Sequence, residues 1–581
     1  MNILFPLVQQ ALEPILSSMG LKVDDWIEHL QSSREPTQGD LTLPCFPFAK
    51  ILRRNPNEIA EEIASSLTEC EGIEECISVN GYVNFRASMQ WLFDHLDRYQ
   101  QTSIEPKDVL IEHTSANPNG PFHVGRARNA ILGDTLVRLH RLAGHTVTAE
   151  YYVDDMGKQV AVLAWALEHL SAEDVERILG DREPPSELWS DKSDHQRVRW
   201  YQAAQLLRQD SEQKEEIEAK ITQYVHASEN GDEDVLDQFS NAYQPVLDGM
   251  LDTLARLGIQ FDRFIKESMF VINGDVSRLI QQLKATDLHN EAENGAFFLD
   301  LGQRGLEGKT DFYYCRGDGS SLYATRDIAY HLWKWTTASH LVNILGEDHK
   351  LQAKQVGLTL EELKSKAPEV VFYSFIKLPD GKMSTRQGNV VFMDDLLEEA
   401  KHRAADVVKE LRPDYEQPKI NSIAEAVGTA AVRFNIIKVS PEKGFIFKWE
   451  DALAFEADSA PFVMYAHTRA CSIQRRVTEL GIHDHEEYLV LPEHIPLGCS
   501  HFLRTIMQFR DALETSVNEH RPHVFANYML QLATAYHAFY RDCHVIDDGR
   551  VNAVYYRISE MGRQALFNGL NALGLAALET M

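Results

Sequence analysis

The sequence predicts an α/β plus all-α protein: a Rossmann-type parallel-sheet domain with a helical insertion, an N-terminal α+β domain and a C-terminal helical bundle. Three observations predict this architecture. The 581 residues are too many for a single hydrophobic core. Strand, glycine-bearing loop, helix and strand patterns follow one another from residue 109. Helical periodicity dominates the last part of the chain. We therefore expect three domains, which span residues 1–105, 106–420 and 421–581.

The first domain is expected to combine helices with a strand pair. An amphipathic helix opens the chain, and another is expected to begin near Pro56, because proline is favoured in the first helical turn. The alternating stretch ISVNGYVNF (77–85) predicts two strands, since Asn80-Gly81 is a strong hairpin signal.

The second domain begins with a βαβ unit. The apolar VLIEHT (109–114) predicts a strand, SANPNGPF (115–122) a loop, the stretch from His123 to Gly144 a helix, and TVTAEYYV (146–153) a second strand. Charged residues at helical spacing predict a helical insertion over about 160–245. Further strands, expected to complete the same sheet, are predicted at 297–301, 311–315, 340–345 and 370–375.

Composition excludes some classes of protein. No apolar run is long enough to span a membrane, and the first residues lack the pattern of an export signal. Seven cysteines without a C-x-x-C pair argue against a disulfide scaffold and against a structural zinc, so we expect a reduced, cytoplasmic protein. The net charge of −30 is unusual for a nucleic-acid binder, but a local basic face remains compatible with it.

The first candidate site lies where the loop before His123 meets its helix. Unpaired N–H groups at a helix N-terminus favour bound phosphate, and a histidine adds a donor there. Gly125 leaves room for a nucleoside against the backbone, while Arg126 offers a guanidinium suited to phosphate. In isolation, this pattern would favour a histidine that caps a helix and a glycine that serves packing.

Glu112 stands at the carboxyl end of an otherwise apolar strand. Open α/β sheets place their ligands at that edge. A carboxylate in such a place needs a partner, and a cationic substrate would supply one. Asn117, in the following loop, is placed where its side chain can approach the same ligand.

The second candidate site is the stretch KLPDGKMSTRQGNVV (377–391). Its glycines, Lys382, Ser384 and Arg386 suit a flexible loop that stabilises charge developing on a transferred phosphate. A charged surface loop without a role in catalysis is the alternative.

Taken together, HVGR (123–126) and KMSTR (382–386) resemble the HIGH and KMSKS signatures of class I aminoacyl-tRNA synthetases. The segments around them resemble arginyl-tRNA synthetases over nearly the whole chain. Similar segments are IEHTSANPNGPFHVGRARNAILGDTLVRLHRLAGHTV (111–147), YYVDDMGKQ (151–159), RGDGSSLYATRDIAYHLWKW (316–335) and FEADSAPFVMYAHTRACSI (455–473). Arg126 and Thr385 depart from the signatures, which place a histidine and a lysine there.

The resemblance implies a role for each matching residue. Arginine would be bound by Glu112, Asn117, Tyr323, Asp327 and His349, with two carboxylates suited to the planar guanidinium. The nucleotide of Mg²⁺–ATP would lie against Asn117, Pro118, His123, Gly125, Lys382 and Met383. Catalysis would rest on positioning and electrostatics from His123, Gly125, Arg126, Lys382, Ser384 and Arg386.

The flanking domains would bind tRNA(Arg). The first domain resembles the family's tRNA-elbow module, in which Tyr82 would stack on a base and Asn84 would read a base edge. A tyrosine buried in the strand is an open alternative. The helical bundle resembles the anticodon-binding domain, with Tyr465 and Arg469 in its matching segment.

The expected reaction joins L-arginine to ATP as arginyl-adenylate and then transfers the arginyl group to tRNA(Arg), releasing AMP and pyrophosphate. We expect a monomer. The alternative is a synthetase-like binding or regulatory protein that no longer charges tRNA, which the two signature departures and the acidic charge would favour.

Overall fold

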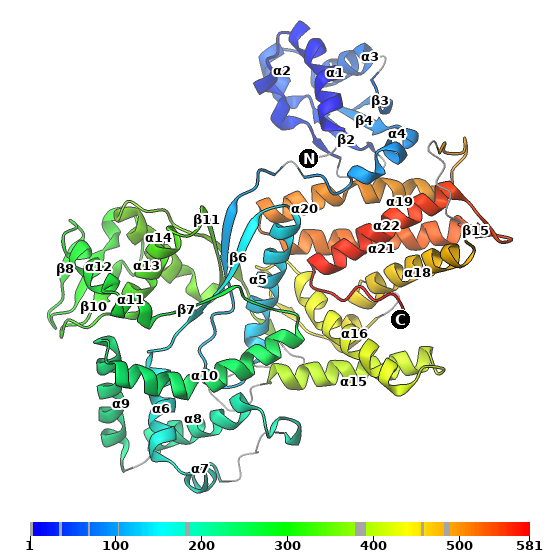
Figure 1. Cartoon of the computed structure of the whole chain (residues 1–581). Coiled ribbons are helices and arrows are strands. Elements are labelled where there is room, and N and C mark those ends of the chain that lie inside the picture. The colour runs from blue at the N-terminus through cyan, green and yellow to red at the C-terminus, as the bar shows by residue number, and fades with distance from the viewer. Residues whose placement is uncertain are drawn as a thin grey trace. The chain divides into compact units, whose positions relative to one another are not determined.

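The computed structural model describes residues 4–33, 38–67, 70–102, 104–180, 186–210, 212–377, 391–454, 458–481 and 489–581. The chain forms two compact units (Figure 1). One consists of Pro106–Ala452, and the other combines Met1–Glu105 with Leu453–Met581.

The unit Pro106–Ala452 is built on a five-stranded parallel sheet. Its strands, in spatial order, are β12 (Glu369–Tyr373), β11 (His340–Gly346), β5 (Asp108–Glu112), β6 (Thr146–Val153) and β7 (Arg263–Lys266). Numbered along the chain, this order is 5-4-1-2-3. Counted from the other edge it is 3-2-1-4-5, which is the strand order of the Rossmann fold. The order reverses between β5 and β11, so the fold places a ligand crevice at their carboxyl ends.

The predicted βαβ unit is confirmed. Helix α5 (Val124–Leu142) connects β5 to β6 and ends before Gly144, whose positive φ of 95° closes it. Its apolar face packs on the sheet through Leu132, Leu136 and Val137. Gly133 is required there, because a Cβ at this position would lie 2.2 Å from that of His113.

A group of helices is inserted between β6 and β7, as predicted. It comprises α6 (Lys158–His169), α7 (Ala172–Leu179), α8 (Ser193–Asp210), α9 (Lys214–Glu229) and α10 (Glu233–Arg256), drawn together in Figure 1. The next strand of the sheet, β7, is only four residues long and was missed by the sequence analysis.

Two predicted strands belong to a different sheet. The stretches 297–301 and 311–315 do form β9 (Phe297–Asp300) and β10 (Asp311–Cys315), but they pair antiparallel with each other and with β8 (His289–Glu291). The prediction that they complete the parallel sheet was wrong. Both strands are joined by a short connection, which antiparallel pairing permits and parallel pairing does not. Helices α11 (Ser268–Ile272), α12 (Asp275–Lys284), α13 (Tyr323–Lys334) and α14 (Lys350–Glu362) accompany this region.

The last part of this unit is helical. It contains β13 (Ile376–Lys377), α15 (Met393–Leu411), α16 (Gln417–Ile437), β14 (Phe445–Ile446) and α17 (Trp449–Ala452). We placed a domain boundary between residues 420 and 421. In the structure α16 packs against α15 and α5, within the Pro106–Ala452 unit. Its buried Arg433 donates to the Asp134 carboxylate of α5 over 2.6 Å.

In the other unit, the N-terminal segment forms an antiparallel sheet with strand order β1-β2-β4-β3. The strands are β1 (Gln31–Ser32), β2 (Leu41–Pro44), β3 (Ile73–Val79) and β4 (Tyr82–Ala87), and the helices are α1 (Phe5–Ser18), α2 (Phe46–Leu52), α3 (Pro56–Ser66) and α4 (Met89–Asp94). The predicted hairpin is confirmed: Asn80 and Gly81 both have positive φ, of 50° and 80°, as a two-residue primed turn requires.

The C-terminal segment of that unit is a helical bundle. Its elements are α18 (Ala460–Glu479), α19 (Leu497–Met507), α20 (Phe509–Asn518), α21 (Pro522–Asp542), the short pair β15 (Ile546–Asp547) and β16 (Arg550–Val551), and α22 (Ala553–Ala572). Arg504 of α19 ties it to the N-terminal segment by pairing with Asp40 and donating to the Ala87 carbonyl. Among the described residues, no helix has the length and apolar character of a membrane span.

Candidate active site

A cavity of about 450 Å³ lies at the carboxyl ends of β5 and β11, where the strand order reverses. It brings together six of the predicted site residues: Glu112, Asn117, Arg126, Tyr323, Asp327 and His349. They come from the end of β5 and the loop after it, the first turn of α5, helix α13 and the turn after β11. Residues more than 200 positions apart in sequence therefore share one pocket, at the place where such sheets bind ligands.

The loop that enters the pocket has a constrained backbone. Thr114 and Ser115, neither of them glycine, have positive φ angles of 68° and 36°. Side-chain contacts hold them: the Thr114 amide donates to Asn129 Oδ1 over 2.6 Å, and the Ser115 hydroxyl donates to Glu112 Oε1 over 3.0 Å. Backbone conformations of this kind persist where surrounding contacts fix them, and they concentrate at functional sites.

Glu112 has a partner within the chain. Its Oε2 accepts from Lys334 Nζ over 2.7 Å, and the Lys334 side chain is 0% exposed. The same ammonium donates to Asn343 Oδ1 over 3.0 Å and lies 4.2 Å from the centre of the Tyr330 ring. The partner that the sequence analysis expected from a cationic substrate is thus supplied by Lys334, although Glu112 still lines the pocket.

Asp327 and Tyr323 lie one turn apart on α13 and both face the pocket. Burial raises the pKa of Asp327, but the hydrogen bond from His331 and the positive charge of Lys334 outweigh it, so the pKa of this carboxyl is lowered overall. Asp327 is therefore ionised at neutral pH. Its Oδ1 lies 3.3 Å from His331 Nδ1, and no lysine or arginine lies within ion-pair distance of it among the residues described.

The helix entry is organised by Arg126 and Asn117. Arg126 NH1 donates to the Asn117 carbonyl over 3.3 Å, and Asn117 Nδ2 donates to Gln159 Oε1 over 3.1 Å. His123 caps the helix by backbone conformation alone. Burial and the charge of Arg126 lower its pKa to about 4, so this imidazole is neutral at pH 7. His123, Gly125 and Pro118 do not line the cavity.

The second predicted motif falls outside the described residues. Lys382, Met383, Ser384, Thr385 and Arg386 all belong to it. The chain resumes beside the helix entry: Phe392 forms a bridge with His123, and the Val124 amide donates to the Val391 carbonyl over 3.1 Å. The end of this motif is therefore attached to the start of α5.

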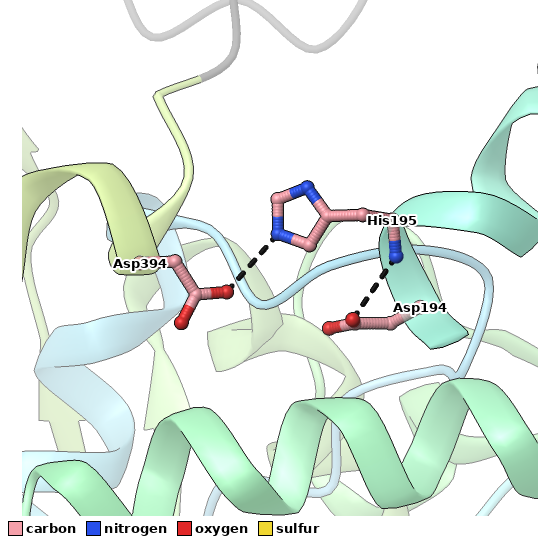
Figure 2. Close-up of side chains that lie close together, drawn as sticks. All are labelled: Asp194, His195 and Asp394. Carbon is pink, nitrogen blue, oxygen red and sulfur yellow. Dashed lines mark hydrogen bonds and ion pairs between the residues drawn. The ribbon is translucent and has the colours of Figure 1, made fainter. Parts of the chain in front are cut away.

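Just beyond that attachment, Asp394 enters a buried cluster with Asp194 and His195 (Figure 2). The three residues have the composition of a metal site, and His195 Nε2 lies 3.0 Å from Asp394 Oδ2. The cation among them is an ammonium: Lys192 Nζ lies 2.7 Å from Asp394 and 3.1 Å from Asp194. Thr253 donates to Asp394 as well. The cluster joins α8, α10 and α15 as an ion-pair network and does not fit a metal ion, because Lys192 fills the place of the cation.

In the other unit, Tyr82 and Asn84 lie on β4 with opposite accessibility. Tyr82 is 38% exposed and meets Phe46 edge-on, with ring centres 5.2 Å apart. Asn84 is 3% exposed, and its Oδ1 accepts from the Thr42 hydroxyl over 2.8 Å. Reading a base edge requires an amide that reaches the surface. The Thr42–Asn84 hydrogen bond links β2 to β4, and the role expected for Asn84 at a base edge stays a prediction.

Tyr465 and Arg469 lie together on α18. The Arg469 guanidinium is 4.4 Å from the centre of the Tyr465 ring and 4.8 Å from that of Tyr540, which is 42% exposed. Arg469 NH1 is 3.2 Å from His537 Nδ1. Burial and the charge of Arg469 lower the pKa of His537 to about 4. This group of aromatic rings around one cation is suited to stacking with bases.

Several residues that line or support the pocket were not predicted from the sequence. They are Tyr152, Asp154, His331, Asn343 and, behind the lining, Lys334. Tyr152 lines this pocket, and its buried hydroxyl has no hydrogen-bond partner among the described residues. Position at a strand end could have indicated Tyr152 and Asp154, by the argument applied to Glu112. His331, Asn343 and Lys334 carry no such signal.

Comparisons with known proteins agree with this geometry. The family described as "tRNA synthetases class I (R), catalytic domain" matches residues 89–449. "Arginyl tRNA synthetase N terminal domain" matches residues 6–87, and "DALR anticodon binding domain" matches residues 463–581. Sheet order, pocket and helix entry, together with these matches, define a class I aminoacyl-tRNA synthetase.

The relatives of this chain indicate which amino acid the synthetase is specific for. The chain is 41% identical to arginine–tRNA ligase of Methanocella arvoryzae over 92% of each chain. It is 38% identical to that of Methanothermobacter thermautotrophicus, over 99% of this chain and 98% of the relative. The solved arginyl-tRNA synthetase of Thermus thermophilus matches with a TM-score of 0.80 and 26% identity, over 100% of both chains. The chain belongs to the arginyl-tRNA synthetases, which are ATP-dependent ligases that join arginine to its tRNA.

Proposed function

We propose that the cavity at the ends of β5 and β11 binds the guanidinium of L-arginine through Asp327. One observation carries the proposal: Asp327 is ionised, lines the pocket and has no lysine or arginine partner among the described residues. Glu112 is already paired with Lys334 and contributes a second, partly neutralised carboxylate. A planar cation with five donors matches such a site, and charge-assisted hydrogen bonds supply the affinity.

Neighbouring groups complete the proposed arginine site. The Tyr323 hydroxyl and the unpartnered Tyr152 hydroxyl offer further hydrogen bonds to the guanidinium. Asn117, in the loop after β5, and His349, in the turn after β11, are proposed to hold the amino and carboxylate end of the substrate. This end must face the helix entry, where ATP reacts.

Adenylate formation is proposed to take place at the start of α5. ATP, as its Mg²⁺ complex, would lie along Asn117, Pro118, His123 and Gly125. The arginine carboxylate attacks the α-phosphate, forming the adenylate and releasing pyrophosphate. His123 acts as a neutral donor because its pKa is about 4, while Arg126 supplies positive charge. Lys382, Met383, Ser384 and Arg386 are proposed to approach the phosphates from the loop that ends beside His123.

Transfer to tRNA(Arg) follows when a terminal ribose hydroxyl takes the arginyl group and AMP leaves. Tyr82, supported by Phe46, is proposed to stack on a base of the tRNA elbow. The Tyr465–Arg469 group is proposed to contact the anticodon loop. We further propose that the protein acts as a monomer in the cytoplasm, without a structural zinc.

The experiment is arginine-dependent exchange of pyrophosphate into ATP, measured with and without tRNA, for wild type and Asp327→Asn. We expect exchange with arginine alone among the amino acids. We also expect an increase in the KM for arginine of about tenfold or more in the variant, because one charge-assisted contact is lost.

The matched control is Asp287→Asn, an exposed aspartate of the same unit that lies outside the pocket. Its KM should equal that of wild type. An unchanged KM in Asp327→Asn would remove the argument for this pocket. Absence of exchange and of aminoacylation under both conditions would favour a synthetase-like binding protein.

A further inference from the structure

A continuous hydrogen-bonded chain links the two carboxylates of the pocket through its buried wall. Glu112 Oε2 accepts from Lys334 Nζ over 2.7 Å, and the same ammonium donates to Asn343 Oδ1 over 3.0 Å. Asn343 Nδ2 lies 2.9 Å from His331 Nε2, and His331 Nδ1 lies 3.3 Å from Asp327 Oδ1. Lys334, Asn343 and His331 are all buried.

The ammonium fixes the orientation of the Asn343 amide. A lysine has donors only, so the atom of Asn343 that faces Lys334 must be the carbonyl oxygen. The other two protons of Lys334 are taken by Glu112 and by the face of the Tyr330 ring. The amide cannot turn over without placing its NH₂ group against a buried ammonium. Its NH₂ group therefore faces His331.

The amide in turn fixes the tautomer of His331. Because Nε2 faces a donor, it must accept and so carries no proton. Nδ1 faces two acceptors, the Asp327 carbonyl at 2.8 Å and the Asp327 carboxylate at 3.3 Å, so it carries the proton. His331 is a neutral donor to Asp327 and not an imidazolium paired with it.

We propose that Lys334 and Asn343 are positioning residues that set arginine specificity by keeping His331 neutral. A protonated His331 would form an ion pair with Asp327 and compete with the guanidinium for the same carboxylate. With His331 neutral, Asp327 keeps its charge for the substrate and is still oriented by a hydrogen bond. The inference rests on the proposed role of Asp327 in binding arginine.

The hydrogen-bonded series connects residues of three elements, and in this way it holds the Glu112 and Asp327 carboxylates in the same wall of the pocket. Glu112 is the last residue of β5, Asn343 lies within β11, and the other three residues lie on α13. The titratable groups that face His331 are Asp327 and Tyr330 of its own helix, with Asn343 of β11 opposite. Asp327 is additionally influenced by Lys334 and by His349 from the turn after β11.

The test is Asn343→Asp, with the KM for arginine measured by pyrophosphate exchange between pH 6.5 and 8.5. An aspartate accepts from both neighbours, so it induces His331 to take a second proton. We expect a KM about tenfold above wild type at pH 6.5 that falls toward the wild-type value as the pH rises and His331 loses that proton. Wild type should show no such trend, and kcat should change less than KM.

Two further variants serve as a comparison and a control for Asn343→Asp. Asn343→Leu removes the donor that faces His331 Nε2, so its KM should also rise as the pH falls, by less than in Asn343→Asp because no carboxylate attracts the proton. Asn435→Asp makes the same chemical change at a buried asparagine of α16, outside the pocket, and should show no pH trend in KM.

Two outcomes would overturn the inference. One is a folded Asn343→Asp variant with a KM that is unchanged or raised equally at all pH values. Should that variant not fold, a KM of Asn343→Leu that does not depend on pH would have the same effect. Asp327→Asn separates the two proposals: if it raises the KM while Asn343→Asp shows no pH trend, arginine binding by Asp327 stands and the His331 relay is wrong.

Discussion

Lys334 is the residue whose role is least visible in the sequence and most explicit in the structure. It lies 222 positions from Glu112 along the chain, yet it supplies the buried partner of that carboxylate. The position of Glu112 at a strand end predicts that it needs a cationic partner. The sequence does not show that this partner is Lys334, because nothing in the helical stretch YHLWKW indicates that its lysine is buried.

Removing this ammonium should destabilise the protein measurably. Lys334→Met leaves Glu112 without its counter-ion and Asn343 without its donor. We expect the free energy of unfolding of this unit to fall by about 3–5 kcal/mol, the range for breaking a buried pair from one side. Urea unfolding measures it, and Lys354→Met, at an exposed position of α14, is the control. Equal stability of the two variants would contradict the account of Lys334.

At the scale of elements, the stretch 392–394, directly after the second motif, makes contacts with two different helical regions. Phe392 pairs with His123 at the start of α5, and Asp394 at the start of α15 is held by Lys192, His195 and Thr253 from the insertion. The insertion therefore holds the start of α15, directly after the residue that pairs with His123. None of the described insertion residues lines the cavity at the ends of β5 and β11.

Loosening this anchor should affect the chemical step more than arginine binding. In Asp394→Asn, the ion pair with Lys192 is lost and the contact with His195 is weakened, so the start of α15 is held less firmly beside the helix entry. We expect kcat for adenylate formation to fall about tenfold while the KM for arginine stays within about twofold. Asp406→Asn, at an exposed position of the same helix, should behave as wild type. A change in KM without a change in kcat would contradict this role.

Elements were predictable where the signal is local. The helix from residue 124 to 142 and the hairpin at Asn80-Gly81 follow from periodicity and turn chemistry. Strand β7, with four residues, is too short for periodicity to reveal, and the pairing of β9 with β10 depends on tertiary contacts. The burial of Asn84 beside an exposed Tyr82 likewise depends on what covers the middle of β4.

Over the whole molecule, buried neutral histidines make stability depend on pH. Burial lowers the pKa of His113, beneath Gly133, from 6.5 to about 4. Between these values the unfolded chain binds a proton that the folded chain does not. The stability is therefore fully present above about pH 6.5 and declines as the pH falls toward 4. His123 and His537 are shifted in the same direction.

As the pH is lowered, the free energy of unfolding should therefore begin to fall before most carboxylates are protonated. Each fully buried histidine should contribute a slope of about 1.4 kcal/mol per pH unit in this window. Urea unfolding of wild type and His113→Asn between pH 4.5 and 7 measures it. The variant should have a shallower slope, whereas His169→Asn, at an exposed position on α6, should have the wild-type slope. Parallel curves for all three proteins would contradict the assignment.

For the whole enzyme, we propose that the choice of arginine depends on one carboxylate, Asp327, which recognises the positive charge of the substrate. Citrulline has the shape of arginine without that charge, so the ratio of kcat/KM for arginine over citrulline in adenylate formation measures the recognition directly. We predict that Asp327→Asn lowers this ratio by about tenfold or more relative to wild type. An unchanged ratio would contradict the claim.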